Sequence, residues 1–261
     1  MKLIHKVEES AVYEYGKCQY TSSSSSAQSN SCIKSFLLKI SSSTLYSESP
    51  LALLSALKKT IKHISNNTST SIQFKAQQVA PLKNFIENLH SNSHERGMAY
   101  TLTLKLLADI GTQLERIRAE RGFIIPFLSL EDIVVIQTEY ESAPDSHYTF
   151  IFINAEKLLQ EPGSAKKELV VDVPLKVNKH TSFLPTELPE SALKRLPMRL
   201  STTSWQYSLS ALCIYALLQH KFKNGEDDIE RVGRPFLHTS LYFCLKRCLK
   251  PDPEERVLLY V

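Results

Sequence analysis

One long amphipathic helix that ends at a glycine and leads into an apolar strand restricts the fold of this chain more than any other feature. Between residues 97 and 119, leucine and isoleucine recur at helical spacing and form a continuous apolar stripe. Gly122 predicts the end of this helix, and Pro126 bends the chain that follows. The β-branched run at residues 133–136 then predicts a buried strand. A loop held between a helix and a strand, with an acidic pair just before the strand, has the layout of a catalytic loop.

The rest of the chain predicts β-structure first and helices later, which indicates an α+β fold. We expect extended structure or strands at residues 1–20, 32–40, 72–75, 133–136 and 148–153, and helices at 51–64, 81–89, 97–119, 208–219, 239–249 and 254–261. Residues 21–31 are too polar to pack and predict a loop. Residues 155–200 contain five prolines and little periodicity, which predicts a long irregular segment of a kind that is often functional. Residues 221–234 are charged and predict a surface loop.

Composition and charge exclude several classes of protein. The chain has 261 residues, of which 43% are hydrophobic and 22% charged, enough for one large or two modest cores. The net charge of +4 comes from scattered lysines and arginines, so we expect no nucleic-acid partner. No segment approaches the ~20 apolar residues of a membrane span, and the N-terminus lacks the apolar core of a secretory signal. The five cysteines form no CxxC pair and fit reduced thiols, which favours an intracellular protein.

The central loop resembles the catalytic loop of protein kinases. Residues 122–128 read Gly-Phe-Ile-Ile-Pro-Phe-Leu and align without a gap with the kinase pattern Gly-x-Ile-His-Arg-Asp-Leu. Phe127 then stands in the place of the catalytic aspartate, and Asp132 in that of the metal-binding asparagine. Residues 150–156 resemble the strand that leads into the kinase Asp-Phe-Gly motif, with Asn154 in the place of its aspartate.

Further matches follow in the kinase order. Residues 183–187 are similar to the Ala-Pro-Glu segment, and residues 205–210 resemble the start of the central C-lobe helix. Residues 248–256 read Cys-Leu-Lys-Pro-Asp-Pro-Glu-Glu-Arg and resemble the kinase ending Cys-Leu-x-x-Asp-Pro-x-x-Arg, which is the most specific of these motifs. In kinases this arginine pairs with the glutamate of Ala-Pro-Glu. The resemblance therefore implies a structural pair between Glu187 and Arg256.

Together the motifs imply a two-lobed, protein kinase-like α+β fold. The resemblance covers the C-lobe well and the N-lobe poorly, and it implies a reduced β-containing N-lobe at residues 1–76 and a mainly helical C-lobe at residues 77–261. The degenerate pattern looks most like kinase-like proteins encoded by large DNA viruses of eukaryotes. This further resemblance implies a viral protein in the cytoplasm or nucleus of a host cell.

The residues that would carry phosphoryl transfer are mostly replaced. The reaction needs bound phosphates, metal ions and an acceptor for the hydroxyl proton. Phe127 cannot accept a proton, and the neutral amide of Asn154 binds Mg²⁺ far more weakly than a carboxylate would. Asp132 remains the one candidate metal ligand, and it could equally cap the hairpin or bond nearby backbone amides.

The phosphate-binding parts are also degenerate. Gly16 is the only glycine in the region where the resemblance implies a glycine-rich loop, which leaves it a weak cofactor-binding candidate. Lys39 stands in the place of the phosphate-pairing lysine and is the other weak candidate. Its glutamate partner should lie in the following helix, but residues 51–64 contain no acid. We therefore expect Lys39 to be an exposed or loosely paired strand residue.

These losses favour a pseudokinase, meaning a catalytically inactive kinase-like protein that acts as a protein-binding or scaffold module. We expect no cofactor beyond weak binding of ATP and Mg²⁺. The partner is a protein of unknown identity, and the basic helix at 51–64 and the loop at 155–180 are candidate contact segments. One alternative is a divergent active protein kinase that uses Asp132 and Glu156 as rearranged metal ligands. The other is an α+β domain unrelated to kinases.

Overall fold

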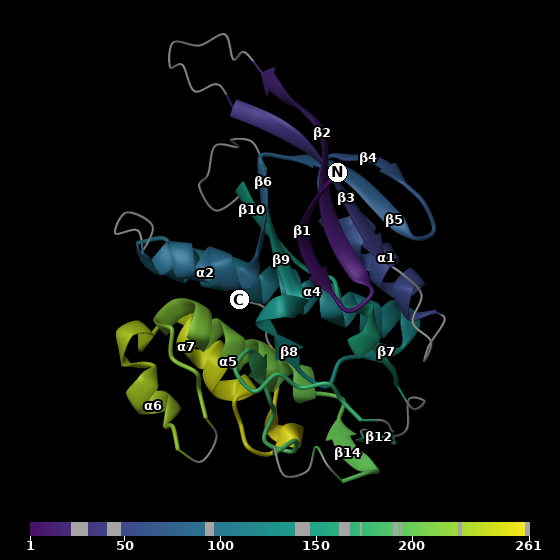
Figure 1. Ribbon diagram of the computed structural model, residues 1–261. Coiled ribbons are helices and arrows are strands. Elements are labelled where there is room, and N and C mark those ends of the chain that lie inside the picture. The colour runs from purple at the N-terminus through teal and green to yellow at the C-terminus, as the bar shows by residue number, and fades with distance from the viewer. Residues whose placement is uncertain are drawn as a thin grey trace.

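The computed structural model describes residues 1–21, 31–40, 48–91, 97–138, 147–161, 168–172, 174–189, 193, 195–223 and 226–258. Figure 1 shows a strand-rich N-terminal lobe above a mostly helical C-terminal lobe. Most of the polar loop predicted at residues 21–31 lies outside the described residues. The two-lobed α+β arrangement is the one that the kinase resemblance implies.

The N-terminal lobe is built on a five-stranded antiparallel sheet in the order β1-β2-β3-β5-β4. Its strands are β1 (Lys2–Val7), β2 (Ser10–Thr21), β3 (Ser31–Ile40), β4 (Ile64–Asn67) and β5 (Ser71–Ala76). Alternate residues of β3, namely Phe36, Leu38 and Ile40, are buried, as expected for a strand with one face on a core. The sheet has more strands than the sequence analysis expected, because the short, polar β4 carries no periodic apolar signal.

Helix α1 (Ser49–Thr60) lies between β3 and β4 in the chain and packs against α4 (Ala99–Arg121). The helix was predicted to run to residue 64, because Ile61 and Ile64 continue its apolar spacing. It ends at Thr60 instead, and His63 takes a left-handed φ of 56° that turns the chain into β4. Lys59 of α1 forms an ion pair of 2.5 Å with Glu120 near the end of α4, which links the two lobes.

Helix α4 ends where the sequence predicts. Gly122 adopts a left-handed conformation, with φ of 65°, and its N–H bonds the carbonyl of Arg118. Inside the helix, Gln113 is fully buried and its amide bonds both the N–H and the C=O of Phe152, at 3.0 and 2.9 Å. This pair of bonds satisfies backbone groups of strand β10 (Tyr148–Phe152) and fixes the strand against the helix.

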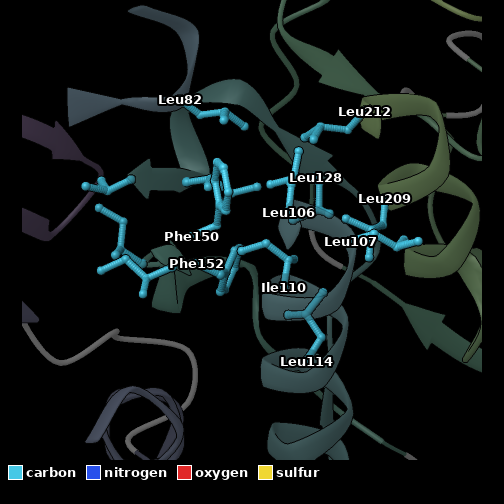
Figure 2. Close-up of a cluster of buried hydrophobic side chains, with 14 of the residues drawn as sticks. Leu82, Leu106, Leu107, Ile110, Leu114, Leu128, Phe150, Phe152, Leu209 and Leu212 are labelled. Atoms are coloured by element: carbon cyan, nitrogen blue, oxygen red, sulfur yellow. The ribbon is translucent and has the colours of Figure 1, made fainter. Parts of the chain in front are cut away.

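The main core lies between α4, strand β10 and helix α5 (Ser204–Leu218). Figure 2 shows α4 in the middle of this cluster, with Phe150 and Phe152 on one side and Leu209 and Leu212 of α5 on the other. Helix α5 is buried on nearly all sides, in agreement with its almost wholly apolar sequence.

The remaining elements complete the fold. They are β6 (Gln78–Pro81), α2 (Leu82–Ser91), β7 (Phe123–Ile124), β8 (Leu128–Ser129), β9 (Ile133–Gln137), β11 (Leu159–Gln160), β12 (Glu168–Val171), β13 (Ser182–Phe183), β14 (Met198–Ser201), α6 (Ile229–Val232) and α7 (Ser240–Cys248). Strands β9 and β10 form a sheet with β6, and the short strands pair as β7–β11, β8–β13 and β12–β14.

Three further secondary-structure expectations need correction. The helix predicted at 254–261 is wrong in its described part, because Asp252 caps only a single 3₁₀ turn at Pro253–Glu255. The segment 155–200 is more ordered than predicted, since long-range pairing forms β11 to β14 without a local periodic signal. The predicted surface loop at 221–234 contains the short helix α6, which Asp228 caps.

The cysteines also differ from expectation. Cys32 is disulfide-bonded, whereas Cys213, Cys244 and Cys248 form no disulfide and are buried. Disulfides persist mainly in oxidising compartments, so cysteine usage no longer supports the expected intracellular location. Among the described residues, the helices are all too short or too polar to cross a bilayer.

Candidate functional site

The site expected from the sequence lies between the lobes, beneath the β1–β2 hairpin. A cavity of about 370 Å³ opens there and is lined by Lys6, Val7, Glu8, Ser129, Glu131, Asp132, Asn154, Lys157, Lys176, Val177 and Asn178. A smaller cavity of about 100 Å³ lies beside it, against Phe127, Glu156 and Leu175. The site therefore combines the hairpin turn, the central loop and two later segments of the chain.

Asp132 lies at the centre of the cleft and is 1% exposed. It ends the single 3₁₀ turn Leu130–Asp132, and its Oδ2 accepts the N–H of Ser129 at 2.7 Å in a capping box. Its Oδ1 accepts the side-chain amide of Asn154 at 2.8 Å. The structure thus brings together two residues predicted from the sequence, and it gives Asp132 the backbone-bonding role considered there.

Lys157 joins this pair, although none of the sequence motifs pointed to it. Its Nζ lies 2.6 Å from Oδ2 of Asp132 and 2.7 Å from Oγ of Ser129, and 4.1 Å from the centroid of the Phe127 ring. The 3₁₀ turn Ala155–Lys157 follows Asn154, and residues three apart eclipse each other in such a turn. The spacing of three residues between Asn154 and Lys157 was therefore the sequence signal that could have placed this lysine beside Asp132.

Phe127 is buried, with 1% of its surface exposed. It belongs to a second apolar cluster, formed by Ile124, Phe127, Leu159, Leu169, Val171, Leu188, Met198 and Leu200. The ammonium of Lys157 lies over its ring in a cation–π contact, and such contacts are stronger when water is excluded. At this position the chain presents a packed aromatic ring to the cleft and no proton acceptor.

The two weak cofactor-binding candidates lie away from Asp132. Lys39 is exposed, because it alternates with the buried Leu38 and Ile40 along β3. Gly16 lies within strand β2 and not at the turn between β1 and β2. The structure brings neither residue to the cavity that Asp132 lines.

The turn that covers the cleft is formed by Glu8 and Glu9, since Val7 pairs directly with Ser10. Glu8 has a φ of 47°, a conformation that favours glycine, and its carboxylate pairs with Lys176 at 2.8 Å. Behind the turn, Nε2 of His5 donates to the carbonyl of Glu131 at 2.7 Å. The hairpin is thus attached to the C-terminal lobe at two points.

The structure places Arg256 against Glu187, the pair that the resemblance implies. Two hydrogen bonds of 2.8 Å join the guanidinium to the carboxylate, and Ser204 donates a third at 2.6 Å. Burial acts to raise the pKa of Glu187, but the hydrogen bonds from Arg256 and Ser204 outweigh it and hold the pKa below its ordinary value. Nε of Arg256 donates to the carbonyl of Lys250, and Nη2, which also bonds Glu187, donates to Oγ1 of Thr186 and to the carbonyl of Pro251.

Ser208 fixes the central loop from below, a role that the sequence analysis did not assign. Its Oγ accepts the N–H of Leu128 at 2.6 Å and donates to the carbonyl of Phe183 at 2.5 Å. Because Leu128 and Phe183 lie in the paired strands β8 and β13, one buried hydroxyl of α5 holds both segments. The only sequence signal was its place among the polar residues in the first half of α5, with Ser204, Gln206 and Ser210.

The residues present do not fit the magnesium ion and the nucleotide that a kinase-like fold implies. The oxygen of the Asn154 amide accepts the N–H of Glu156, so its NH₂ group and not its oxygen faces Asp132. Mg²⁺ requires a near-octahedral shell of oxygen atoms, and the ammonium of Lys157 already occupies one side of the carboxylate. The turn over the cleft presents the carboxylate of Glu8, which pairs with the ammonium of Lys176, one of the cations that could otherwise bind a phosphate.

Comparison with known proteins shows the fold. A rhoptry kinase from Toxoplasma gondii superimposes with a TM-score of 0.53 at 13% identity, over 98% of this chain and 73% of that one. The kinase domain of a Toxoplasma gondii specific rhoptry antigen gives a TM-score of 0.50 at 12% identity, over 99% of this chain and 76% of that one. No family model and no curated protein matches the sequence. The chain has a protein kinase-like fold.

Proposed function

We propose that this protein is a pseudokinase, which binds other proteins through a kinase-like surface and does not transfer phosphate. The observation that carries the proposal is Phe127. By the sequence resemblance it stands in the place of the proton acceptor, and in the structure it is buried in an apolar cluster and covered by the ammonium of Lys157. An aromatic ring cannot take the proton of a substrate hydroxyl, and kinase chemistry depends on that step being assisted.

The phosphate side of the cleft supports the same proposal. Lys39 is exposed, and the turn over the cleft carries Glu8 and Glu9. Two of the lysines that line the cleft are already paired with carboxylates of the same molecule, Lys176 with Glu8 and Lys157 with Asp132, and these pairs compete with a triphosphate for the cations. The proposal therefore includes the absence of productive ATP binding.

The alternative of a divergent active kinase required Asp132 and Glu156 to share metal ions. Asp132 lines the larger cavity, whereas Glu156 lines the smaller one, and Lys157, the residue after Glu156, pairs with Asp132. We therefore retain the pseudokinase as the better supported function. The viral origin implied by the sequence resemblance stays a prediction.

A phosphotransfer assay tests the catalytic part. The purified chain is incubated with radiolabelled ATP and Mg²⁺ or Mn²⁺, with generic protein substrates and with itself. We expect no transfer above that of Asp132→Ala. Metal-dependent transfer that is lost in this variant would contradict the proposal. In parallel, thermal unfolding at millimolar ATP and Mg²⁺ should show no rise in melting temperature, because a ligand that binds the folded state must stabilise it.

The binding part is tested on helix α1, whose exposed residues Lys58 and Lys59 form a basic end. Affinity capture from cells with the wild-type chain is compared with Lys58→Glu and with Lys83→Glu on α2 as a control for charge. We expect a reproducible partner that is lost with the first variant only. Identical capture with both variants would remove α1 from the contact surface.

A further inference from the structure

A buried carboxylate at the centre of the cleft is neutralised by a side chain of the same molecule. Asp132 is 1% exposed, and the side chain of Lys157 is 14% exposed. In the described part of the chain, three groups donate hydrogen bonds to this carboxylate: the N–H of Ser129, the amide of Asn154 and the ammonium of Lys157. A buried carboxylate without such partners is strongly disfavoured, so the cluster requires one positive charge.

We infer that Lys157 is the built-in cation of this site and that it excludes divalent metal ions. The kinase-like fold implies metal binding here, and the residues present disagree with that expectation. The carboxylate and the ammonium cancel each other's charge at 2.6 Å. A divalent ion on Asp132 would lie within a few ångströms of the ammonium, and like charges at that distance repel strongly in a partly buried site.

Asn154 is the second possible metal ligand, and its side-chain oxygen does not face Asp132. Nδ2 of Asn154 faces Asp132, and Oδ1 of Asn154 accepts the N–H of Glu156 within its own turn. The amide therefore acts as a donor to the carboxylate and offers its oxygen elsewhere. A hard cation prefers several oxygen ligands, but of these two residues only Asp132 offers its oxygens here, and its carboxylate is already paired with Lys157.

The same ammonium ties together segments that are distant in the sequence. It donates to Oγ of Ser129 in β8, and that hydroxyl shares a hydrogen bond of 2.7 Å with Oγ of Ser182 in β13. Its other face covers the ring of Phe127. In this arrangement a covalently attached cation gives the cleft a fixed structure at any concentration of metal ion.

The first test uses the wild-type chain without nucleotide. Mn²⁺ binding is measured by electron paramagnetic resonance, and thermal unfolding is followed with about 10 mM MgCl₂, MnCl₂ or EDTA. We expect no bound Mn²⁺ and one melting temperature in all conditions. A saturable rise in melting temperature that EDTA reverses and that Asp132→Asn abolishes would overturn the inference.

The second test removes the cation. Lys157→Ala leaves the carboxylate of Asp132 unpaired, so we expect a melting temperature lower by several degrees and a new recovery of about 3 °C with Mn²⁺. Lys157→Met retains most of the side-chain volume and replaces the alanine variant if that one does not fold. The double variant Asp132→Asn with Lys157→Ala should show no response to Mn²⁺.

Lys176→Ala is the matched control, because Lys176 lines the same cavity and pairs with Glu8 at the surface. Its melting temperature should fall little and should not rise with Mn²⁺. If a folded Lys157 variant shows no rise in melting temperature with Mn²⁺, another feature excludes the metal and the inference is overturned. The inference addresses the site of the proposed function and rests on it, but metal binding is measured without ATP or substrate, so the two can fail separately.

Discussion

The guanidinium of Arg256 and the carboxylate of Glu187 face each other in a two-pronged pair, 69 residues apart in the chain, with both hydrogen bonds at 2.8 Å. No surface of the Arg256 side chain is exposed. Removal of one partner leaves a charge buried and unpaired. Arg256→Ala should therefore lower the free energy of unfolding by about 3–5 kcal/mol, measured by urea denaturation. Arg199→Ala, which breaks an exposed pair with Glu168, is the control and should change little. Equal effects would contradict a structural role for the buried pair.

The same pair predicts a loss of stability in acid. The folded-state pKa of Glu187 lies below its usual value of 4.5, so its stabilisation is complete above that pH. It is lost as the pH falls through the folded-state pKa. In Arg256→Ala, burial acts without the guanidinium, and this acid-dependent loss should disappear. Urea midpoints between about pH 2 and pH 6 measure the difference. Parallel curves for the two proteins would argue against the prediction.

Asp109 should behave in the opposite way. Burial raises its pKa above the usual 3.8, although the N–H of Phe150 and the ammonium of Lys105 both act to lower it. A carboxyl with a raised folded-state pKa reduces stability as the pH rises through the interval between its unfolded and folded values. Asp109→Asn should remove this decrease and still accept the bond from Phe150. The measurement is the difference in the free energy of unfolding between the variant and the wild type at each pH. A difference that does not change with pH would contradict the prediction.

Two buried serines of α5 offer a matched comparison. Ser208 accepts from Leu128 and donates to Phe183, whereas Oγ of Ser210 has no nitrogen or oxygen partner among the described residues. Ser208→Ala leaves a buried N–H and a buried C=O unpaired and should cost about 1–3 kcal/mol. Ser210→Ala should be close to neutral. A similar cost for both variants would mean that packing and not hydrogen bonding determines the effect.

The disulfide of Cys32 predicts a chemical difference between the cysteines. Alkylation of the denatured chain before reduction should label Cys213, Cys244 and Cys248, and should label Cys32 only after reduction, as read by peptide mass spectrometry. Reduction should also lower the melting temperature, since a native disulfide typically contributes about 2–5 kcal/mol. Complete labelling of Cys32 without reductant would restore the expectation of reduced thiols.

The sequence was most informative where local chemistry decides the structure. Gly122 ends α4 with a left-handed φ, and the apolar run of α5 forms a buried helix, as their compositions predict. It was least informative where distant segments meet. The turn at Glu8 lacks the glycine that its φ favours, so nothing in the local sequence marked it as the cover of the cleft.

The site itself was predicted only in part for the same reason. Asp132 and Asn154 could be aligned with a known motif, and the structure places them in contact. Lys157 falls outside that motif. A single turn of 3₁₀ helix brings its side chain back toward Asn154, and the packed ring of Phe127 lies beneath its ammonium. Such roles arise from three segments at once, and no periodicity in one of them reveals the others.

The two contacts of the β1–β2 hairpin, from His5 to Glu131 and from Glu8 to Lys176, join the lobes through side chains of the protein itself. A protein that touches both lobes would therefore meet a surface that is already assembled. Its association would not have to immobilise one lobe against the other, and ordering of this kind is a main cost of forming a complex. Docking would then be limited by encounter and surface complementarity, with little rearrangement of this chain on the way.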